Sequence, residues 1–359
     1  MRALVLGAYG HQGRILCQQL TQIAGVTVLG AGKRHDCLST LANDLDIETI
    51  MVDWRDKDLA GVLTDNNIHI VIHAAGPFHG QDYSVAQACI DSGCYYLDIA
   101  DNRDFVNGIQ ILDDQARNAN VLVASGMGLL TLTDAIVEYM QDKVTIINHM
   151  DIGYSGSGKV PGLASVQSSL HYCGQPVSLV EEGKKAEVRG LSDPTVHHFG
   201  NQFLSRELVN IDGPELEFLT AKHCLKSITL KAGYGQRGPK IMSAIAKLVA
   251  KGWIKNPQGL AHKLMKLTKL VERSSHKKGA IFVEIEGRDS QDKVVECVYE
   301  IHTTEDKFDE LKVVSIAAIV KRLMIDFVPE AGAYPGMGLI RLEDALEALG
   351  RENVTIYKN

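Results

Sequence analysis

The chain has 359 residues, 45% of them hydrophobic and 23% charged, which indicates a globular protein of about two domains whose core needs no disulfide or metal staple. The net charge of −7 argues against nucleic acid as the main partner. The sequence has no run of about 18 apolar residues, which argues against integral membrane insertion. It has no signal-peptide pattern, and its seven cysteines are scattered without a CxxC pair. We therefore expect a cytoplasmic protein with free thiols.

Short apolar strands alternate with helices in the first third of the chain. The expected strands are 2–6, 26–31, 49–52, 69–75, 95–99 and 121–124. The expected helices are 13–23, 84–92 and 105–119. This alternation is typical of a parallel sheet covered on both faces, so residues 1–128 are predicted to form an α/β, doubly wound (Rossmann) domain.

The pattern changes after residue 128. Longer strands are expected at 145–155, 225–231, 280–288 and 294–303, with helices at 312–327 and 342–349. Long strands joined by a hairpin loop such as 287–292 indicate a mixed or antiparallel sheet. A second, α+β domain is therefore predicted.

A glycine-rich turn follows the first expected strand. It reads Gly7-Ala8-Tyr9-Gly10-His11-Gln12-Gly13, a GxxGxxG pattern. Glycines at this spacing allow a tight turn, close approach of the backbone to a pyrophosphate and close packing of the helix on its strand. The pyrophosphate then lies at the helix N-terminus, where free N–H groups favour negative charge. We expect dinucleotide binding by Gly7, Tyr9, Gly10, His11, Gln12 and Gly13; a plain tight turn is the alternative.

The residues after the second strand bear on which dinucleotide binds. NAD enzymes usually carry an acid at this strand end, which holds the ribose 2′-hydroxyl. Here Lys33 and Arg34 follow the strand, and two cations suit a 2′-phosphate. We therefore expect NADP, with NAD as the less favoured alternative because Asp36 lies slightly farther on, and a solvated loop as the plainer interpretation of the two cations. Asp53, after the third strand, is either an adenine contact or an exposed loop acid.

Three further segments carry a family resemblance. They are His73-Ala74-Ala75-Gly76-Pro77-Phe78, Gly93-Cys94-Tyr95-Tyr96-Leu97-Asp98-Ile99-Ala100-Asp101-Asn102-Arg103 and Ser125-Gly126-Met127-Gly128. With the glycine turn, they resemble the saccharopine dehydrogenase (reductase) family, which has AAGPF-like and YLD strand ends. The stretch 175–184 is similar to the substrate domain of that family. The resemblance therefore covers the whole chain and is strongest over 1–130.

The resemblance implies both a fold and a chemistry. The last helices would return to the first domain, so we expect a dinucleotide-binding domain of 1–128 plus 312–359 and a substrate domain of 129–311. The family also implies reversible hydride transfer at a C–N bond, as in saccharopine, lysine or carboxynorspermidine metabolism. Related enoyl reductases of lipid-linked substrates carry a Gly-Glu soon after the strand-five acid, and Asp101-Asn102 in this chain count against that assignment.

Ligands of an open parallel sheet bind outside the carboxyl ends of its strands. The ends of the fourth and sixth strands are therefore expected to line the nicotinamide ribose. The residues concerned are Ala74, Ala75, Gly76, Pro77, Phe78, Gly126 and Met127. Pro77 and Phe78 would form an apolar wall.

Candidate catalytic side chains lie at the fifth strand end and in the second domain. Asp101 is expected to transfer a proton to or from the amine nitrogen, and Arg103 to clamp a substrate carboxylate. A local ion pair between these two is the alternative, and Asp98 is more simply a loop cap. Tyr154 and His149 are further candidate proton donors.

The stretch Gly153-Tyr154-Ser155-Gly156-Ser157-Gly158-Lys159 resembles a phosphate loop. Val160 stands where the Mg²⁺ ligand of such a loop would be, so a triphosphate site is not expected. The stretch is predicted either to border the substrate pocket or to serve as a plain connection.

Positive charge is concentrated late in the chain. Residues 221–278 hold fourteen Lys or Arg and one acid, Glu272. The part 240–273 fits two amphipathic helices, most simply a pair packed on the sheet with a solvated cationic face. A rim that attracts an acidic substrate and peripheral contact with anionic lipid are the alternatives.

These patterns predict an NADP(H)-dependent oxidoreductase. Its substrate would be the imine or secondary amine of a carboxylate-bearing amino acid or polyamine precursor. A non-catalytic NADP-binding sensor or scaffold and an enoyl reductase are the alternatives. No metal is expected because the cofactor carries the hydride, and a homodimer paired through strand edges is expected.

Overall fold

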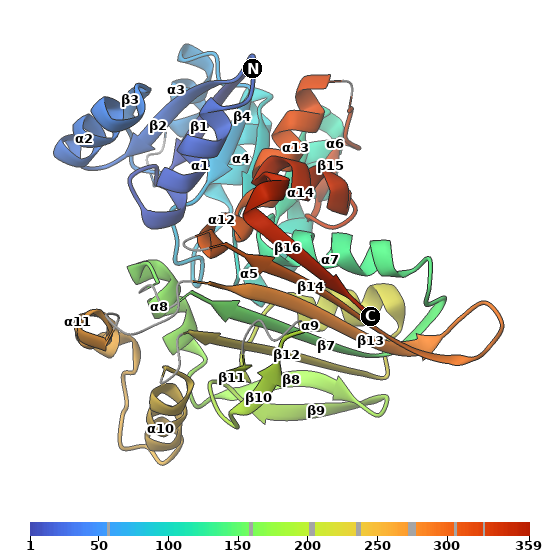
Figure 1. The fold of residues 1–359 in the computed structure, drawn as a ribbon. Coiled ribbons are helices and arrows are strands. Elements are labelled where there is room, and N and C mark those ends of the chain that lie inside the picture. Colours follow the sequence, from blue (N-terminus) through green and yellow to red (C-terminus); the bar gives the residue numbers. More distant parts are fainter. Residues whose placement is uncertain are drawn as a thin grey trace. The chain divides into compact units, whose positions relative to one another are not determined.

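The structure is a computed structural model that describes residues 1–55, 58–157, 161–200, 205–234, 238–271, 278–304, 307–325 and 327–359. The chain forms two compact units (Figure 1). The first consists of Met1–Leu132 with Glu310–Ala348, and the second of Thr133–Asp309 with Leu349–Asn359. The boundaries between the units at residues 132, 309 and 348 fall inside helices.

The first unit contains a parallel seven-stranded sheet in the order β15-β6-β5-β4-β1-β2-β3. The strands are β1 Arg2–Leu6, β2 Thr27–Gly32, β3 Glu48–Met51, β4 Ile70–His73, β5 Tyr95–Asp98, β6 Leu122–Ser125 and β15 Gly332–Pro335. The central strands are buried along nearly their whole length, as expected where helices cover both faces. The predicted doubly wound domain is confirmed, although β15 was not predicted.

Helices connect these strands. They are α1 His11–Thr21, α2 His35–Leu45, α3 Leu59–Asp65, α4 Ser84–Ser92, α5 Arg103–Gly108, α6 Asp113–Ala119 and α7 Leu129–Met140. The single helix expected over 105–119 is wrong, because a 3₁₀ turn (Ile109–Leu112) separates α5 from α6. A tertiary contact lies at the break: the Tyr83 hydroxyl donates to the Phe105 carbonyl, and a Cβ on Gly108 would lie 2.1 Å from that hydroxyl.

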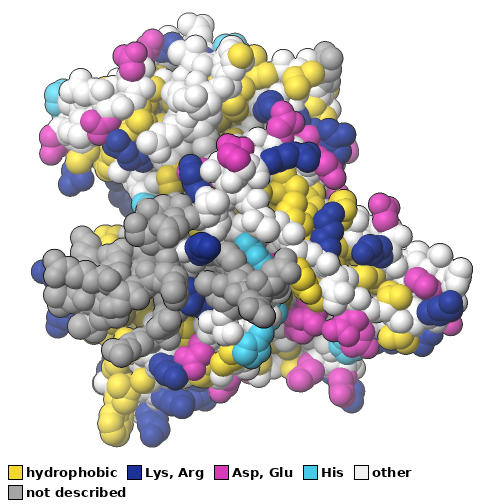
Figure 2. All heavy atoms as spheres, in the orientation of Figure 1, with side chains coloured by type: hydrophobic (Ala, Val, Ile, Leu, Met, Phe, Trp, Pro, Cys, Tyr) yellow, Lys and Arg dark blue, Asp and Glu magenta, His cyan; other side chains and the backbone are white. Residues whose placement is uncertain are grey.

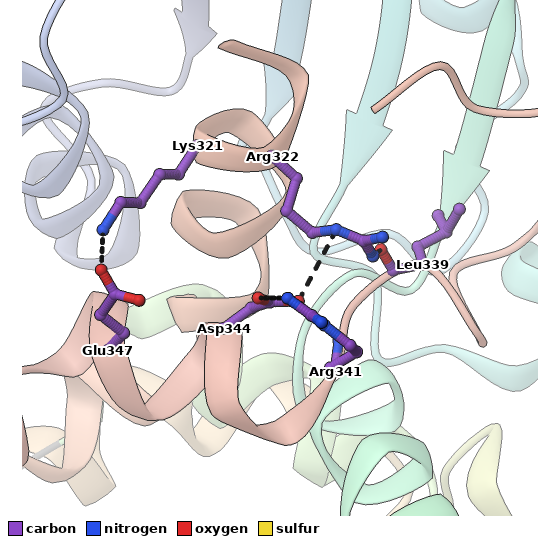
Figure 3. A network of polar contacts seen from close by, with 6 residues as sticks. All are labelled: Lys321, Arg322, Leu339, Arg341, Asp344 and Glu347. Carbon is purple, nitrogen blue, oxygen red and sulfur yellow. Dashed lines mark hydrogen bonds and ion pairs between the residues drawn. The ribbon is translucent and has the colours of Figure 1, made fainter. Parts of the chain in front are cut away.

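The C-terminal helices α12 Phe308–Leu311, α13 Val314–Ile325 and α14 Leu342–Leu349 follow the second sheet in the chain. Polar contacts fasten α14 to α13 (Figure 3). Arg322 Nε lies 3.6 Å from Asp344, while Lys321 pairs with Glu347. The helices expected at 312–327 and 342–349 are thus present.

The second unit contains a mixed seven-stranded sheet in the order β10-β11-β12-β7-β13-β14-β16. Its strands are β7 Ile146–Gly156, β10 Thr195–His198, β11 Ser205–Asn210, β12 Ser227–Tyr234, β13 Ala280–Arg288, β14 Val294–Thr303 and β16 Val354–Lys358. The β7–β12 pair is parallel and the other pairs are antiparallel. The predicted mixed sheet is confirmed. β16 pairs with β14, so the last residues of the expected 312–359 segment belong to this unit.

This second sheet curls strongly. Three strands separate β10 from β13, yet the ring of His197 on β10 stacks on Phe282 of β13 at 3.7 Å with an interplanar angle of 3°. Phe282 lies flat because Gly153 beneath it has no side chain; a Cβ there would be 1.9 Å from the ring. The concave face thus holds an apolar cluster of Phe199, Leu208, Ala280 and Phe282.

The remaining elements of this unit are the hairpin β8 Pro176–Glu181 and β9 Lys184–Arg189, and the helices α8 Leu163–His171, α9 Glu215–His223, α10 Gly238–Ala250 and α11 Ala261–Val271. The last two are the predicted basic helices. Ala246, Val249 and Ala261 pack in one apolar cluster with α8 and β11, while Lys247, Lys251 and Lys263 are exposed. Lys and Arg side chains gather around these helices at the lower left of Figure 2. No helix among the described residues is long and apolar enough to cross a membrane.

Candidate functional site

The glycine turn after β1 is shaped by close backbone approaches. Gly7 has φ +80°, and a Cβ on it would lie 2.9 Å from the backbone of Ala75, after β4. A Cβ on Gly13 would lie 2.2 Å from the Gly7 carbonyl oxygen, so α1 packs directly against the turn. Only glycine fits at positions 7 and 13. A dinucleotide-binding turn needs glycine for the same two reasons, a tight turn and close packing of the helix.

The N-terminus of α1 is available to an anion. Its N-cap is Gly10, in extended conformation, and within this fully described stretch neither a capping side chain nor an acid of the first turn occupies the helix end. The first N–H groups of a helix have no partner inside the helix, and the helix dipole adds positive potential. This end of the helix fits a pyrophosphate, with His11 and Gln12 in its first turn.

The end of β2 packs against the Tyr9 ring. A Cβ on Gly32 would lie 2.3 Å from the Tyr9 ring, and the Tyr9 hydroxyl accepts a hydrogen bond from the Lys33 N–H. The Arg34 guanidinium lies over the same ring, 5.3 Å from its centroid. Lys33 and Arg34 are exposed. Tyr9 therefore packs against the last residue of β2, and two cations lie beside its ring.

Asp53, the expected adenine contact, is engaged by its neighbours. Lys33 Nζ lies 2.7 Å from its carboxylate, and the Arg55 N–H donates to it. Burial alone would raise the pKa of Asp53, but Lys33 and Arg55 hold it below its ordinary value. Asp53 thus anchors Lys33 at the end of β2. Asp36 lies exposed in the first turn of α2.

The chain leaves β4 through a tight loop, so the strand ends at His73 rather than at residue 75 as expected. The side-chain amide of Gln81 donates to the carbonyls of Ala75 and Pro77 and holds the loop closed. Ala74, Ala75, Gly76 and Pro77 are half-buried beside the glycine turn. Phe78, by contrast, is buried against His73 and Phe105, so its ring supports the loop from inside.

Asp98 ties the ends of β5 and β6 together. One of its carboxylate oxygens accepts the N–H groups of Ala100 and Gly126, at 2.9 and 2.8 Å. Burial raises the pKa of Asp98 to about 6, although these hydrogen bonds act in the other direction. Gly126 has φ +77°, and the Met127 N–H donates to the Asp98 carbonyl. Asp98 therefore caps this loop and fixes Gly126 at the same sheet edge as Gly7 and Ala75.

A buried histidine lies beside this loop. His73 is 1% exposed, and its Nδ1 lies 3.1 Å from the Tyr96 hydroxyl. Burial lowers the pKa of His73 to about 3, so the ring is neutral at physiological pH. The sequence identified His73 only as part of a strand end.

The other candidates of the first unit lie close to this edge. Met127 is fully buried, and a Cβ on Gly336 would lie 2.2 Å from its sulfur. Asn102 caps α5 by accepting the Phe105 N–H. This cap places Asp101, which is exposed, and Arg103, which is half-buried, at the start of α5. The carboxyl ends of β1, β4, β5 and β6 thus bring together most of the residues expected to bind the cofactor.

Tyr154 lies in the second unit, in a buried polar network. Its hydroxyl donates to Glu215 at 2.9 Å and lies 2.9 Å from Thr133 Oγ1. Burial and the Glu215 carboxylate raise the pKa of Tyr154 well above its ordinary value. This network joins α7 and α9 to β7 and leaves Tyr154 4% exposed.

The stretch that resembles a phosphate loop is mostly strand. Residues 153–156 belong to β7, and His149 lies on the same strand. Lys159 and Val160 lie outside the described residues. One polar group nearby was missed altogether: Arg206 on β11, which is 4% exposed. No motif surrounds it in the sequence, and β11 was not predicted.

Comparison with known proteins gives a family match over the first part of the chain and many similar folds, including two that cover the whole chain. Residues 3–127 match the family described as saccharopine dehydrogenase NADP binding domain. The saccharopine dehydrogenase (L-Glu forming) of Saccharomyces cerevisiae superposes with a TM-score of 0.69 at 11% identity, over 100% of this chain and 99% of that chain. The homospermidine synthase of Legionella pneumophila, solved with NAD, gives 0.61 at 12% identity, over 100% and 91%. At these identities the likeness shows the fold alone, and no curated protein matches the chain.

Proposed function

We propose that this protein is an NADP(H)-dependent oxidoreductase that transfers hydride at a C–N bond, because residues 3–127 match the saccharopine dehydrogenase NADP-binding domain family. The observation that carries the proposal is the edge where the glycine turn, the loop after β4 and the Asp98-anchored loop after β6 meet. Backbone groups and glycines dominate this edge, as a site for a dinucleotide requires.

The cofactor would be held from both ends by residues of the first unit. Gly7, Gly10 and Gly13 would receive the pyrophosphate at the start of α1. Lys33 and Arg34 would pair with a 2′-phosphate beside the Tyr9 ring. The bound nicotinamide supplies the hydride, and the protein supplies position and proton transfer.

The substrate is proposed to be an imine or secondary amine that bears a carboxylate. The similar whole-chain folds support this class, since they belong to a saccharopine dehydrogenase and a homospermidine synthase. Asp101 is our proposal for the group that exchanges a proton with the amine nitrogen, and Arg103 for a carboxylate clamp. Both lie at the end of β5, outside the carboxyl edge of the sheet.

Cofactor choice is tested by titrating the protein with NADPH and with NADH. We expect tighter binding of NADPH, and a loss of about 10–100-fold in its affinity in Lys33→Ala/Arg34→Ala, because a charge-assisted contact is worth about 1.5–3 kcal/mol. NADH binding should change little in the double variant. Arg14→Ala is the matched control, because it removes a cation that pairs with Asp44 instead. Equal affinity of the unmodified protein for the two cofactors would contradict the 2′-phosphate assignment.

A further inference from the structure

Arg206 is a buried cation with no counter-ion among the described residues. It is 4% exposed, and among the described residues its Nε and Nη2 atoms have no hydrogen-bond partner and no acid forms an ion pair with it. Burial lowers the pKa of the guanidinium, and no charge in the described part of the chain opposes this shift. A buried, unpaired charge destabilises a fold strongly, so its presence calls for a partner that is not part of the described chain.

The strand register places Arg206 on the concave face of the second sheet. It lies directly opposite His197, whose ring stacks on Phe282 inside the curl. Leu208, two residues farther along β11, packs in the apolar cluster of the same face. Because alternate residues of a strand share a face, Arg206 points to the same side as Leu208.

Ser155 is a second unpartnered donor on this face. Its side chain is fully buried, and its hydroxyl has no hydrogen-bond partner among the described residues. It lies two residues after Gly153, over which the Phe282 ring packs, and opposite Gly233 of β12. Ser155 and Arg206 therefore stand on one concave face, toward the carboxyl ends of the parallel strands β7 and β12, on strands about 10 Å apart.

The neighbouring acids are already engaged. Glu300 accepts hydrogen bonds from His302 and from the Gly200 N–H, and faces His197. Burial alone would raise the pKa of Glu300, but these partners lower it to about 2, so it stays ionised among them. Glu207, next to Arg206, pairs with Lys240. Neither carboxylate neutralises Arg206.

The chemistry of the two donors selects an anionic oxygen group. A guanidinium presents parallel N–H donors that match a carboxylate or a phosphate, and a serine hydroxyl adds a third donor. The rings of Phe199, Phe282 and His197 on the same face are suited to a carbon chain attached to that group.

We propose that Arg206 and Ser155 form an anion site on the concave face of the second sheet, and that this site binds a carboxylate of the substrate. The assignment to a substrate rests on the proposed function, whereas the anion site itself does not. Arg206 is then a binding residue that determines which substrates are accepted. The described residues offer Arg206 no counter-charge, and in this proposal the ligand supplies it.

The site is tested by ligand binding in the absence of any dinucleotide. Glutarate, inorganic phosphate and neutral 1,5-pentanediol are titrated by calorimetry, and thermal unfolding is followed in parallel. We expect glutarate to bind and to raise the unfolding temperature, and pentanediol to do neither. Arg206→Met should bind glutarate at least tenfold more weakly, yet unfold at a higher temperature than the unmodified protein without ligand, because it removes an unpaired buried charge.

Three further variants sharpen the result. Arg206→Lys, which keeps the charge but loses the planar fork, should bind weakly, and Ser155→Ala should bind with intermediate affinity. Arg189→Met removes an exposed arginine of the same unit and should behave as the unmodified protein. If Arg206→Met does not fold, Arg206→Lys carries the comparison.

The proposal is overturned if glutarate does not bind, or binds the Arg206 variants as tightly as the unmodified protein. Tighter binding of phosphate than of glutarate would overturn the carboxylate assignment. NADPH affinity, measured separately, should be unchanged in Arg206→Met. Absence of NADPH binding by the unmodified protein would refute the proposed function and leave the anion site standing.

Discussion

At the scale of single residues, His73 and Asp98 form an unusual buried pair. Both lie at the carboxyl edge of the first sheet, and the Tyr96 hydroxyl lies between their strands, beside His73. Burial lowers the pKa of His73 to about 3 and raises that of Asp98 to about 6. The same cause shifts the two pKa values in opposite directions because burial disfavours the charged form of each group.

The two groups have opposite effects on stability in the same pH range. The neutral His73 stabilises the fold above the ordinary histidine pKa of 6.5, and this contribution is lost as the pH falls toward 3. The protonated Asp98 stabilises the fold below the ordinary pKa of 3.8, and this contribution is lost as the pH rises through about 6. Between about pH 4 and pH 6, His73 is protonated only in the unfolded chain and Asp98 only in the folded chain. The two pH-dependent changes in the free energy of unfolding therefore cancel in this range.

Replacing Asp98 should leave the pH dependence of the unfolding free energy that His73 causes without compensation. Asp98→Asn keeps an oxygen for the N–H groups of Ala100 and Gly126 but removes the acid. Relative to the unmodified protein, we expect its free energy of unfolding to fall by about 1.4 kcal/mol per pH unit as the pH drops from 6 to 4. Urea unfolding at several pH values measures this, with the exposed Asp114 replaced by Asn as the control. Parallel pH profiles of Asp98→Asn and the unmodified protein would contradict the assigned shifts.

The sequence predicted the residues whose role depends on local backbone conformation. It did not predict those whose role depends on burial by distant segments of the chain. Gly7 and Gly13 are recognisable because a close approach admits no other residue, and the spacing of such glycines is local. Arg206 is an ordinary arginine in the sequence. What makes it a candidate is the curl of a sheet whose strands come from four distant segments, and no local pattern encodes that.

At the scale of elements, Asp344 is the main polar link between α13 and α14 (Figure 3). Its carboxylate pairs with Arg341 at 2.9 Å and with Arg322 at 3.6 Å, and its side chain is 14% exposed. Burial alone would raise the pKa of Asp344, but these arginines hold it below its ordinary value. Its contribution to stability is therefore present above the ordinary pKa of 3.8 and is lost as the pH falls below it.

Asp344→Asn should lower the free energy of unfolding by about 1 kcal/mol at neutral pH, because the partly buried carboxylate loses two charged partners. Glu347→Gln is the matched comparison, since Glu347 and its partner Lys321 are both more exposed. We expect the Glu347 variant to lose less stability in the same urea titration. A larger loss in Glu347→Gln than in Asp344→Asn would contradict this ranking.

Element prediction succeeded where burial is continuous and failed where tertiary contacts intervene. β13 and β14 were predicted at their observed bounds because their alternating apolar residues and the hairpin loop are local signals. β10 is mostly exposed and β11 begins with the polar residues Ser205, Arg206 and Glu207, so both lack such a signal. The helix expected over 105–119 is interrupted where a distant side chain, Tyr83, donates to one of its carbonyls.

At the scale of the whole molecule, each unit supplies a different part of the proposed activity. The first carries the dinucleotide cradle and the proposed Asp101 and Arg103, and the second carries the proposed anion site at Arg206. The basic helices α10 and α11 pack through small and apolar side chains, and Lys247 and Lys263 on them are exposed. This fits the simplest expectation for them, and attraction of an acidic substrate and peripheral contact with anionic lipid stay untested predictions.

The central claim, hydride transfer to a carbon bonded to nitrogen, is tested most directly by following deuterium from NADPH labelled at both C4 positions of the nicotinamide. The protein is incubated with amino acids or polyamines together with 2-oxo acids or aldehydes, and the products are analysed by mass spectrometry. We predict a secondary amine with one deuterium on the carbon next to nitrogen, and none with Gly13→Ala, in which the cofactor turn cannot close. Tight NADPH binding without deuterium in any amine of the panel would contradict the account and favour a non-catalytic sensor or scaffold.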